Sequence, residues 1–387
     1  MRENKQAVLF ANTLWFLINF KSSLIEELHS KNYKIKILYL RKGGVIDQKI
    51  LQRIVSKKIK IIPFYKYFFN SILPYKSSFS NLKSEKLLFS FTIGPLFLGL
   101  LPVFFKYKKF ATLEGLGRLF TSRSLHHRVL KRFVEIFYRY YLFKRYEKVF
   151  VLNYVDYAYI LEHKLVSISK IFIIPGTGID ADKFNPKILR KERKKLNLYD
   201  SSNNLKTNKL YITFIGRISP EKGFYRFIAA VFFLISNEES KKFKFRIVSP
   251  KSDISNLPTS FKDHLNSLDI EFKNYSANPL EYYAYSKIIV IPTTYAEGLS
   301  RVALEASFLG IPIAAISNRG VTALFFDGIL GELTMDQEPY GISLLIKKIN
   351  ENYSDYIVLP EKVFESLRRK YDNNASITSI LRVIEKN

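Results

Sequence analysis

Residues 214–223 (FIGRISPEKG) combine a glycine turn with two cationic side chains. The segment follows an apolar run typical of a strand and precedes a helical pattern over 224–235. Gly216 allows a tight turn where strand meets helix, and Arg217 and Lys222 then lie near a helix N-terminus, whose free N–H groups favour anions. A planar guanidinium and a mobile ammonium suit a diphosphate. The spacing alone leaves two interpretations open, diphosphate binding or solvated basic residues in a loop.

Glu297 and Glu305, eight positions apart, form the second candidate group. We expect Glu297 at the carboxyl end of a strand and Glu305 on the second turn of the next helix, on the side of the sheet where open α/β folds bind ligands. Two carboxylates at different depths suit the hydroxyls of both sugars of a nucleotide-sugar. The alternative is structural, with Glu305 paired to a neighbour and Glu297 acting as an acid near a helix start.

The turn between the two glutamates supplies backbone donors. Gly298 opens this turn, and the helix that follows begins with free N–H groups, which offer a second cradle for an anion. The residues that contribute these groups are Leu299, Ser300 and Arg301.

Short apolar runs separated by amphipathic helical stretches must position these groups. Continuous apolar runs are typical of parallel strands that helices cover on both faces, so the pattern predicts βαβ units in two series. The simplest architecture is an α/β chain of two doubly wound, Rossmann-like sheets that face each other across a cleft. The expected strands are 7–10, 35–40, 60–63, 87–92, 110–113, 148–152, 171–174, 211–215, 243–248, 288–291 and 313–315.

The length of 387 residues is typical of two domains. We expect an N-terminal domain over 1–186, a C-terminal domain over 187–366, and a final helix within 367–387 that returns to the N-terminal domain. The polar stretch 190–208 is expected to begin the second domain after a linker.

Positive charge is concentrated in the first half of the chain. The whole sequence has 61 Lys and Arg against 34 Asp and Glu, a net charge of +27. Residues 1–185 hold 32 basic and 12 acidic residues, a balance of +20, which leaves +7 for 186–387. Such a field attracts polyanions, whether nucleic acid, anionic lipid head groups or phosphorylated substrates. A Lys-, Ile- and Asn-rich coding bias explains part of the excess but not its asymmetry.

Residues 87–105 (LLFSFTIGPLFLGLLPVFF) are uncharged over a length close to that of a membrane-spanning helix. Gly94, Pro95 and Pro102 interrupt the run, which favours a short buried strand, a turn and a short apolar helix. A spanning helix is the alternative. The first residues lack the pattern of a signal peptide, so we expect none, and the absence of cysteine fits a cytoplasmic protein.

Taken together, the motifs resemble retaining glycosyltransferase family 4, which has the GT-B fold. The resemblance rests on Arg217, Lys222 and Gly223 followed by Glu297 and Glu305. Other segments that resemble the family are 174–184 (IPGTGIDADKF) at the domain junction, and 318–320 and 327–331 in its sugar-side loop.

The N-terminal half resembles a branch of the family that extends lipid-linked precursors of bacterial polysaccharides. The resemblance is carried by 12–21 (NTLWFLINFK), 114–117 (EGLG) and 151–156 (VLNYVD). Two positions depart from the family pattern. Residues 176–178 (GTG) replace the usual P-N-G, and Gly94 stands where this branch often has a lysine.

The resemblance implies a role for each charged group. Arg217 and Lys222 would neutralise the donor diphosphate, Glu305 would hold the ribose hydroxyls, and Glu297 would contact the transferred sugar. In the implied retaining mechanism the leaving diphosphate helps to take the acceptor's proton, while the two cations stabilise the charge that grows as the bond breaks. No metal or other cofactor is then required.

Metal and acceptor contacts carry weaker signals. Asp180 and Asp182 match the D-x-D pattern of metal-dependent glycosyltransferases, but we expect a coincidence in the junction loop. His127 follows the 114–117 loop and is a candidate to meet the acceptor, with an exposed histidine on a basic helix as the alternative. The candidate residues on the acceptor side are Asn12, Gly115, Gly117 and His127.

Aromatic and basic residues interleave in 64–69 (FYKYFF) and in 131–145 (KRFVEIFYRYYLFKR). On a helix, the second run suits an anionic membrane interface. The same mixture suits stacking on single-stranded nucleic acid, or plain core packing with a solvated basic face.

We therefore expect a retaining, metal-independent hexosyltransferase at the cytoplasmic, inner face of the cell membrane, bound peripherally to an anionic surface. It would move a hexose or N-acetylhexosamine from a nucleotide diphosphate sugar, with UDP as the expected nucleotide, to a lipid diphosphate-linked saccharide in bacterial surface polysaccharide synthesis. The alternatives are a cytosolic transferase acting on a protein or small glycoside, a non-catalytic glycan-binding module, and a basic nucleic-acid-binding protein. No recognition helix supports the last, so we expect no nucleic-acid partner.

Overall fold

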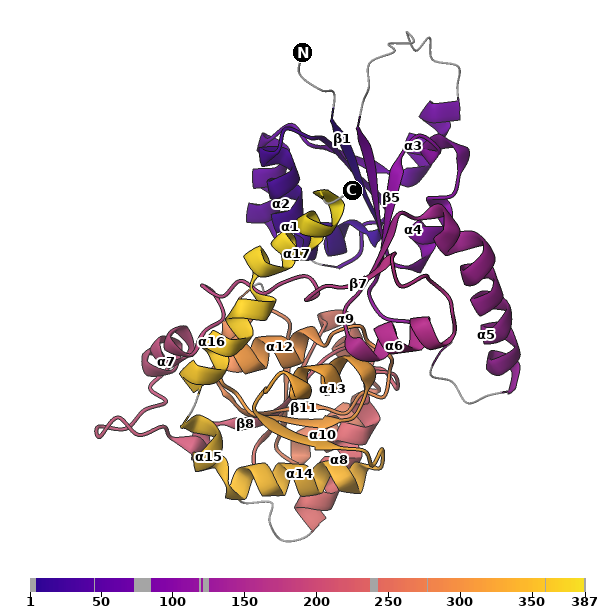
Figure 1. The fold of residues 1–387 in the computed structure, drawn as a ribbon. Helices are drawn as coiled ribbons and strands as arrows, with labels where there is room; N and C mark the ends of the chain where they lie inside the picture. The colour runs from indigo at the N-terminus through magenta and orange to yellow at the C-terminus, as the bar shows by residue number, and fades with distance from the viewer. Residues whose placement is uncertain are drawn as a thin grey trace. The chain divides into compact units, whose positions relative to one another are not determined.

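The computed structural model describes residues 5–44, 46–72, 85–117, 120, 125–236, 243–276, 278–358 and 360–385. The chain divides into two compact units. Unit 1 consists of Met1–Gly178 and Asn373–Asn387, and unit 2 consists of Ile179–Asp372. Each unit contains one parallel sheet flanked by helices (Figure 1).

Unit 1 is built on a seven-stranded sheet with the order β3-β2-β1-β4-β5-β6-β7. All neighbouring strands are parallel, and the direction in which strands are added reverses between β1 and β4. The strands are β1 (Gln6–Thr13), β2 (Lys34–Arg41), β3 (Lys60–Pro63), β4 (Lys86–Phe91), β5 (Lys108–Leu113), β6 (Lys148–Val151) and β7 (Ile171–Ile173).

The helices of unit 1 follow its strands along the chain, except that the last one comes from the C-terminus. They are α1 (Leu14–Ser30), α2 (Gln48–Ser56), α3 (Phe64–Ile72), α4 (Ile93–Leu98), η1 (Pro102–Phe104), α5 (Leu125–Phe137), η3 (Tyr138–Leu142), η4 (Phe143–Arg145), α6 (Tyr154–Glu162) and α17 (Asn373–Glu385).

Unit 2 is built on a six-stranded parallel sheet with the order β10-β9-β8-β11-β12-β13, and the reversal here lies between β8 and β11. The strands are β8 (Tyr211–Ile215), β9 (Phe245–Ser249), β10 (Ile270–Asn274), β11 (Ser286–Ile291), β12 (Ile313–Ile316) and β13 (Gly331–Thr334). The helices are α7 (Pro186–Lys195), η5 (Thr207–Lys209), α8 (Phe224–Ser236), α9 (Lys251–Ser255), α10 (Thr259–Ser267), α11 (Leu280–Tyr283), α12 (Arg301–Phe308), α13 (Arg319–Phe326), α14 (Pro339–Glu351), α15 (Tyr353–Ile357) and α16 (Pro360–Tyr371).

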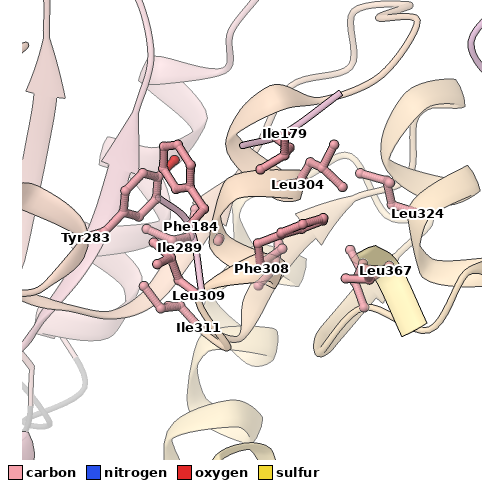
Figure 2. Packing of buried hydrophobic residues seen from close by; sticks show 14 of the residues in the cluster. Ile179, Phe184, Tyr283, Ile289, Leu304, Phe308, Leu309, Ile311, Leu324 and Leu367 are labelled. Atoms are coloured by element: carbon pink, nitrogen blue, oxygen red, sulfur yellow. The ribbon is translucent and has the colours of Figure 1, made fainter. Parts of the chain in front are cut away.

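The sheet of unit 2 separates two hydrophobic cores. Along β11, Ile288 and Val290 pack into one cluster, while Ile289 and Ile291 pack into the other, because successive side chains of a strand point to opposite faces. Figure 2 shows the second cluster, in which Phe308 of α12 lies among residues from several elements. Burial on both faces explains why the central strands are continuous apolar runs.

The boundaries of the units differ from the expected ones at 186/187 and 366/367. The first boundary lies after Gly178, because Ile179 and Phe184 are buried in the core of unit 2. The second lies after Asp372, because Leu367 on α16 packs into the same core. Helix α17 belongs to unit 1, where the Ser376 hydroxyl donates a hydrogen bond to the Gly176 carbonyl at 2.7 Å.

Each of the eleven expected strands overlaps an observed strand, with ends that agree within three residues. The strands β10 and β13 were not predicted. Both lie at edges of the six-stranded sheet, and neither is a continuous apolar run, since side chains along them are partly exposed. The periodicity argument therefore found every strand of the seven-stranded sheet, including its edge strands β3 and β7, and missed only the two edge strands of the six-stranded sheet.

The polar stretch 190–208, expected to begin the second domain, lies near the start of unit 2, and its first residues form the end of helix α7. Helix α7 carries Arg193, whose guanidinium is buried and donates to the backbone carbonyls of Ala284 at 2.9 Å and Ser286 at 2.7 Å. These bonds fasten the polar stretch to the start of β11. A buried arginine that satisfies backbone carbonyls cannot be distinguished in the sequence from a solvated one.

The uncharged run 87–105 forms a strand and short helices, as the first of the two interpretations expected. It contains β4, α4 and η1, with Phe89 and Leu96 buried in unit 1. Among the helices in the described part of the chain, none has both the length and the apolar character needed to cross a membrane.

Candidate functional site

The candidate residues of unit 2 gather at the carboxyl edge of its sheet. All six strands run parallel, so the segments that follow them emerge at the same edge. The adjacent strands β8 and β11 lead to the two predicted motifs, and the strand order reverses between them. A reversal of this kind leaves a crevice at the carboxyl ends of the strands, where open α/β folds bind ligands.

The loop after β8 is held tightly in place. The Gly216 N–H donates to the Val248 carbonyl at 3.0 Å, and the Ile218 N–H donates to the Asp253 carboxylate at 3.0 Å. Gly223 has φ +76°, and a Cβ there would lie 2.2 Å from the carbonyl oxygen of Pro292 at the end of β11. Only glycine permits this approach of loop to strand.

The loop after β11 is fixed by hydrogen bonds to its neighbours. The Thr293 hydroxyl donates to the Glu221 carbonyl at 2.7 Å, and the Asn318 amide donates to the Thr293 carbonyl at 3.1 Å. Gly320, at the start of α13, lies so close that a Cβ would be 2.8 Å from the carbonyl oxygen of Glu297. The start of α13 thus packs closely against the backbone of Glu297.

Lys222 and Glu297, one from each loop, form an ion pair and a hydrogen bond between the ammonium Nζ and the carboxylate Oε1. The lysine side chain is 33% exposed and the glutamate 13% exposed. The pair is thus accessible from solvent on the cationic side. The ammonium of Lys222 is therefore the more accessible partner of the pair.

Glu305 is also paired, in agreement with the structural alternative considered for it. Its Oε1 lies 2.8 Å from Nε of Arg301, and its Oε2 accepts a hydrogen bond from the Tyr283 hydroxyl at 2.9 Å. Each carboxylate oxygen has two acceptor positions, so both can still accept a hydrogen bond from a ligand hydroxyl. These partners fix the direction in which the carboxylate faces.

The first turn of α12 lies between the two glutamates. Gly298 and Leu299 lead into the helix, and the Ser300 hydroxyl caps it by accepting from the Ala303 N–H at 3.4 Å. The N-terminal N–H groups of a helix have no partner within the helix, so this end attracts anions.

Arg217 is exposed and extends from the β8 loop. Among the described residues, no carboxylate forms an ion pair with its guanidinium. Its field reaches Tyr275, which follows β10: partial burial and then the carboxylates of Asp253 and Glu305 raise the pKa of the Tyr275 hydroxyl, while Arg217 opposes them. The charges of Arg217 and Glu305 therefore act in opposite directions on the same hydroxyl.

Unit 2 thus carries the four charged groups on the segments at the carboxyl edge of its sheet, and two of them, Lys222 and Glu297, are in direct contact. Three further residues were not predicted. Asp253 follows β9 and would have been found by asking which acids come after each strand. Tyr275 and Tyr283 carry no signal in the sequence, because tyrosine is common in this chain.

The candidates of unit 1 lie at the carboxyl edge of the other sheet. The Asn12 N–H, near the end of β1, donates to the Thr92 hydroxyl at 3.3 Å, and a Cβ on Gly94 would lie 2.7 Å from the Asn12 side-chain oxygen. Thr92 follows β4 with φ 72°, a strained value for a β-branched residue. Strain of this kind clusters at functional sites, so Asn12 retains its place among the candidates.

Gly115 and Gly117 follow β5 and have φ values of +123° and +81°. The preceding Glu114 lies 2.8 Å from the ammonium of Lys21, in a direction that does not give an aligned hydrogen bond. Lys21 is only 2% exposed and also lies over the Phe91 ring at 4.6 Å. This buried ion pair was not predicted.

His127 lies on α5 and is half-buried. Its Nδ1 is buried and makes no hydrogen bond within the described part of the chain. No hydrogen bond among the described residues joins His127 to Asn12, Gly115 or Gly117, and the grouping of these four candidates stays a prediction.

The D-x-D residues Asp180 and Asp182 lie in a turn at the start of unit 2. The Asp180 carboxylate accepts hydrogen bonds from the backbone N–H groups of Asp182 and Lys183, which is ordinary turn geometry. Within the described residues, no three His, Asp or Glu side chains are grouped so as to hold a metal ion.

Comparisons with known proteins identify the likeness of the C-terminal half. Residues 197–375 match the model of the family described as "Glycosyl transferases group 1". The match covers the whole carboxyl edge of unit 2, from Arg217 to Gly320.

Two curated relatives are distant. One is the UDP-Gal:alpha-D-GlcNAc-diphosphoundecaprenol alpha-1,3-galactosyltransferase of Escherichia coli, 28% identical over 193 residues, which are 48% of this chain and 47% of that protein. The other is the capsular polysaccharide biosynthesis glycosyltransferase CapM of Staphylococcus aureus, 23% identical over 69% of each chain. The chain therefore spans about half the length of the first relative.

The crystal structure of Anabaena Alr3699/HepE in complex with UDP and glucose is similar over the whole chain. The TM-score is 0.69 at 14% identity, with coverage of 98% of this chain and 99% of that one. The predicted GT-B fold, with two Rossmann-like domains, is thereby confirmed, and the comparisons together support a GT-B glycosyltransferase.

Proposed function

We propose that this protein is a retaining glycosyltransferase. It transfers a hexose or N-acetylhexosamine from a UDP-sugar to a lipid diphosphate-linked saccharide in the synthesis of a bacterial surface polysaccharide. The observation that carries the proposal is the ion pair between Lys222 and Glu297 at the strand reversal of unit 2. The family match over the same residues supports it.

The pair suggests how the donor enters. In the proposal, the diphosphate of the donor binds the exposed Arg217 and takes Lys222 away from Glu297. The freed Glu297 carboxylate then accepts hydrogen bonds from the hydroxyls of the sugar to be transferred. The ammonium of Lys222 keeps an anionic partner in this exchange, while the Glu297 carboxylate exchanges its cation for hydrogen bonds from the sugar hydroxyls.

Glu305 is proposed to accept hydrogen bonds from the ribose hydroxyls. Arg301 and Tyr283 hold its carboxylate in one orientation, and a fixed acceptor loses less freedom on binding than a mobile one. The start of α12 provides further N–H donors for the diphosphate.

The chemical step follows from these positions. As the bond from the anomeric carbon to the diphosphate breaks, negative charge grows on the diphosphate, and Arg217 and Lys222 stabilise it more strongly than in the ground state. The departing diphosphate oxygen takes the proton of the acceptor hydroxyl, whose oxygen attacks the same face of the sugar. The products are UDP and the extended saccharide, with no metal required in the proposal.

The choice of donor and acceptor is supported by relatives. The name of the E. coli relative specifies UDP-galactose and an acceptor on diphosphoundecaprenol, and that of the S. aureus relative specifies capsular polysaccharide. An acceptor of this kind is anchored in lipid, so the proposal places the enzyme at the inner face of the cell membrane.

The proposal is tested by incubating the full chain with UDP-, GDP- and ADP-sugars, each with and without a lipid diphosphate-linked saccharide. The expected result is UDP release that depends on the lipid acceptor, together with a product whose new linkage keeps the anomeric configuration. Release stimulated equally by a free glycoside would favour the cytosolic alternative. The absence of release from every donor in the presence of the lipid acceptor would contradict the proposal.

A further inference from the structure

Helix α5 and the π-helical turn η3 expose a row of large apolar side chains on unit 1. These residues are between 46% and 66% exposed, although each is aliphatic or aromatic. We call this row the α5 face, and it consists of Val129, Leu130, Phe133, Ile136, Tyr140 and Tyr141. Spacings of three and four residues place them along one side of the helix. Apolar surface gathered in this way marks an interaction site.

The opposite side of the same segment is anchored in the core of unit 1. Tyr138, Leu142 and Phe143 are buried there. Burial raises the pKa of Tyr138 to about 12, which agrees with its place in the apolar interior. Because the other side of the segment already packs on the core of unit 1, the exposed row is not the face that attaches this helix to its own unit.

The charges beside the α5 face have one sign. Residues 125–145 hold six Lys and Arg and one acid, Glu135. That acid is buried, where it accepts a hydrogen bond from the Tyr159 hydroxyl and lies 3.9 Å from Lys131. The exposed cations are Arg128, Arg132, Lys144 and Arg145. The solvent side thus presents apolar side chains among positive charges only.

The α5 face continues toward the uncharged run 87–105 through stacked rings. Tyr141 stacks on Phe137 with centroids 5.7 Å apart, and Phe137 stacks on Phe97 of α4 at 5.2 Å. Phe97 and its neighbour Ile93 are both partly exposed. The apolar surface therefore extends from α5 onto α4, and Figure 1 draws these helices of unit 1 in purple.

We infer that the α5 face docks on an anionic lipid bilayer, with its apolar side chains at the level of the head groups and its cations on lipid phosphates. Apolar side chains among lysines and arginines are the combination that binds an anionic interface. A second copy of the chain is disfavoured, because two faces of the same positive charge would repel each other. The inference deepens the proposed function, on which the choice of a lipid partner partly rests.

The inference is tested by flotation of the full chain with vesicles of phosphatidylcholine alone and of phosphatidylcholine with phosphatidylglycerol. We expect flotation with the anionic vesicles, and loss of it as salt is added. The double variant Phe133→Ser/Tyr141→Ser should reduce partitioning by more than about tenfold. Arg128→Gln/Lys144→Gln should reduce it roughly fivefold per charge on anionic vesicles only. The control is Ile168→Ser, which removes an apolar side chain of somewhat greater exposure elsewhere in unit 1.

A second measurement avoids removing the apolar side chains as a group. The chain has no cysteine, so Val129→Cys and Ile168→Cys each create a unique site for a polarity-sensitive fluorophore. We expect anionic vesicles to shift the emission of the label at 129 to the blue and to leave the label at 168 unchanged. Equal responses at both sites, or no flotation of the native chain, would overturn the inference. A dimer that Phe133→Ser dissociates, in a chain that does not float, would assign the face to a second copy.

Failure of the inference can be separated from failure of the proposed function by measuring UDP binding in the same samples. The residues of the α5 face belong to unit 1, whereas the proposed donor site lies in unit 2. If the chain binds UDP and does not float, only the membrane inference is contradicted. If it floats and binds no nucleotide, the membrane inference stands and the proposed enzymatic function is contradicted.

Discussion

Both units reverse their strand order next to their first strand, at β1 and β4 in unit 1 and at β8 and β11 in unit 2. In unit 2 the segments after β8 and β11 are joined by the pair of Lys222 and Glu297, and in unit 1 Lys21, on the helix after β1, pairs with Glu114 after β5 and lies over the ring of Phe91 at the end of β4. In unit 1 the side chain of Lys21 is 2% exposed, whereas that of Lys222 in unit 2 is 33% exposed. If the buried pair separated, the ammonium of Lys21 would be left without a partner in a place that solvent hardly reaches. The ammonium of Lys222 is accessible, so a ligand anion can replace its partner. The same type of strand reversal therefore occurs with a buried, structural ion pair in unit 1 and with an accessible ion pair in unit 2.

The largest expected effect comes from removing the accessible pair of Lys222 and Glu297. Lys222→Ala or Glu297→Ala should reduce turnover by ~10²–10³-fold, because each removes a charge contact made in the transition state. The free energy of unfolding should change by less than about 1 kcal/mol, as for other partly exposed pairs. Turnover is measured as UDP release, and stability by urea unfolding.

A matched control for this pair exists in the same unit. Lys195 and Glu192 form an exposed ion pair at 3.1 Å on α7, away from both motif loops. Lys195→Ala should leave turnover unchanged. Native turnover in Lys222→Ala, combined with a large loss of stability, would show that the accessible pair is structural after all.

The buried pair should respond in the opposite way. Glu114→Ala leaves the ammonium of Lys21 unpaired in a nearly inaccessible place, and breaking a buried pair costs about 3–5 kcal/mol of unfolding free energy. Urea unfolding measures this loss. Lys31→Ala, which removes an exposed pair with Glu385 in the same unit, should cost less than about 1 kcal/mol. Similar small losses in both variants would contradict the structural role of the buried pair.

Two glycines test whether the β8 loop that carries Lys222 must pack closely against β11. Gly223 and Gly328 have similar φ values of +76° and +86°. A Cβ at Gly223 would lie 2.2 Å from the Pro292 carbonyl oxygen, whereas a Cβ at Gly328 would meet nothing within 4 Å. Gly328→Ala should cost only the strain of a left-handed alanine, roughly 1–2 kcal/mol. Gly223→Ala should cost more, measured by thermal unfolding. Equal costs would mean that the β8 loop does not need its close contact with β11.

The smallest expected effect concerns Tyr138, beneath the α5 face. Burial raises its pKa to about 12, so the folded state favours the neutral phenol. The stability that comes from keeping this phenol neutral is fully present below the unfolded pKa near 10 and is lost as pH rises toward 12. At pH 11 the free energy of unfolding is lower by about 1.4 kcal/mol. Tyr138→Phe should match the native chain at pH 8 and resist urea better at pH 11. An identical pH dependence in both proteins would place this hydroxyl in solvent.

The sequence located the charged candidates of unit 2 on its sheet more closely than the candidates of unit 1, for a physical reason. Arg217, Lys222, Glu297 and Glu305 each lie within a short loop or first helical turns after a buried strand, so locating the strand locates the residue. The pairing of Lys222 with Glu297 then follows from the adjacency of β8 and β11, which strand patterns alone do not reveal. Parallel strands that are neighbours in the sheet need not be neighbours in sequence.

The residues that were missed depend on contacts between distant segments. The sequence around Lys21 is compatible with a lysine on the exposed side of a helix as well as with one buried against Glu114, so no local signal reveals the pair. Tyr283 is found only once α11 is seen to pack beside α12, and Arg193 only once α7 is seen against β11. The edge strands β10 and β13 lack the apolar signal because solvent covers part of them.

The central claim is that a nucleoside diphosphate binds unit 2 by displacing Glu297 from Lys222, and calorimetric titration with UDP tests it most directly. Native protein should bind UDP; Arg217→Ala and Lys222→Ala should each weaken binding by roughly 10–100-fold, as expected for the loss of a charge-assisted contact. Glu297→Gln should bind UDP at least as tightly as the native chain, because the competing carboxylate is gone. Undiminished affinity in both cation variants, or weaker affinity in Glu297→Gln, would contradict the account.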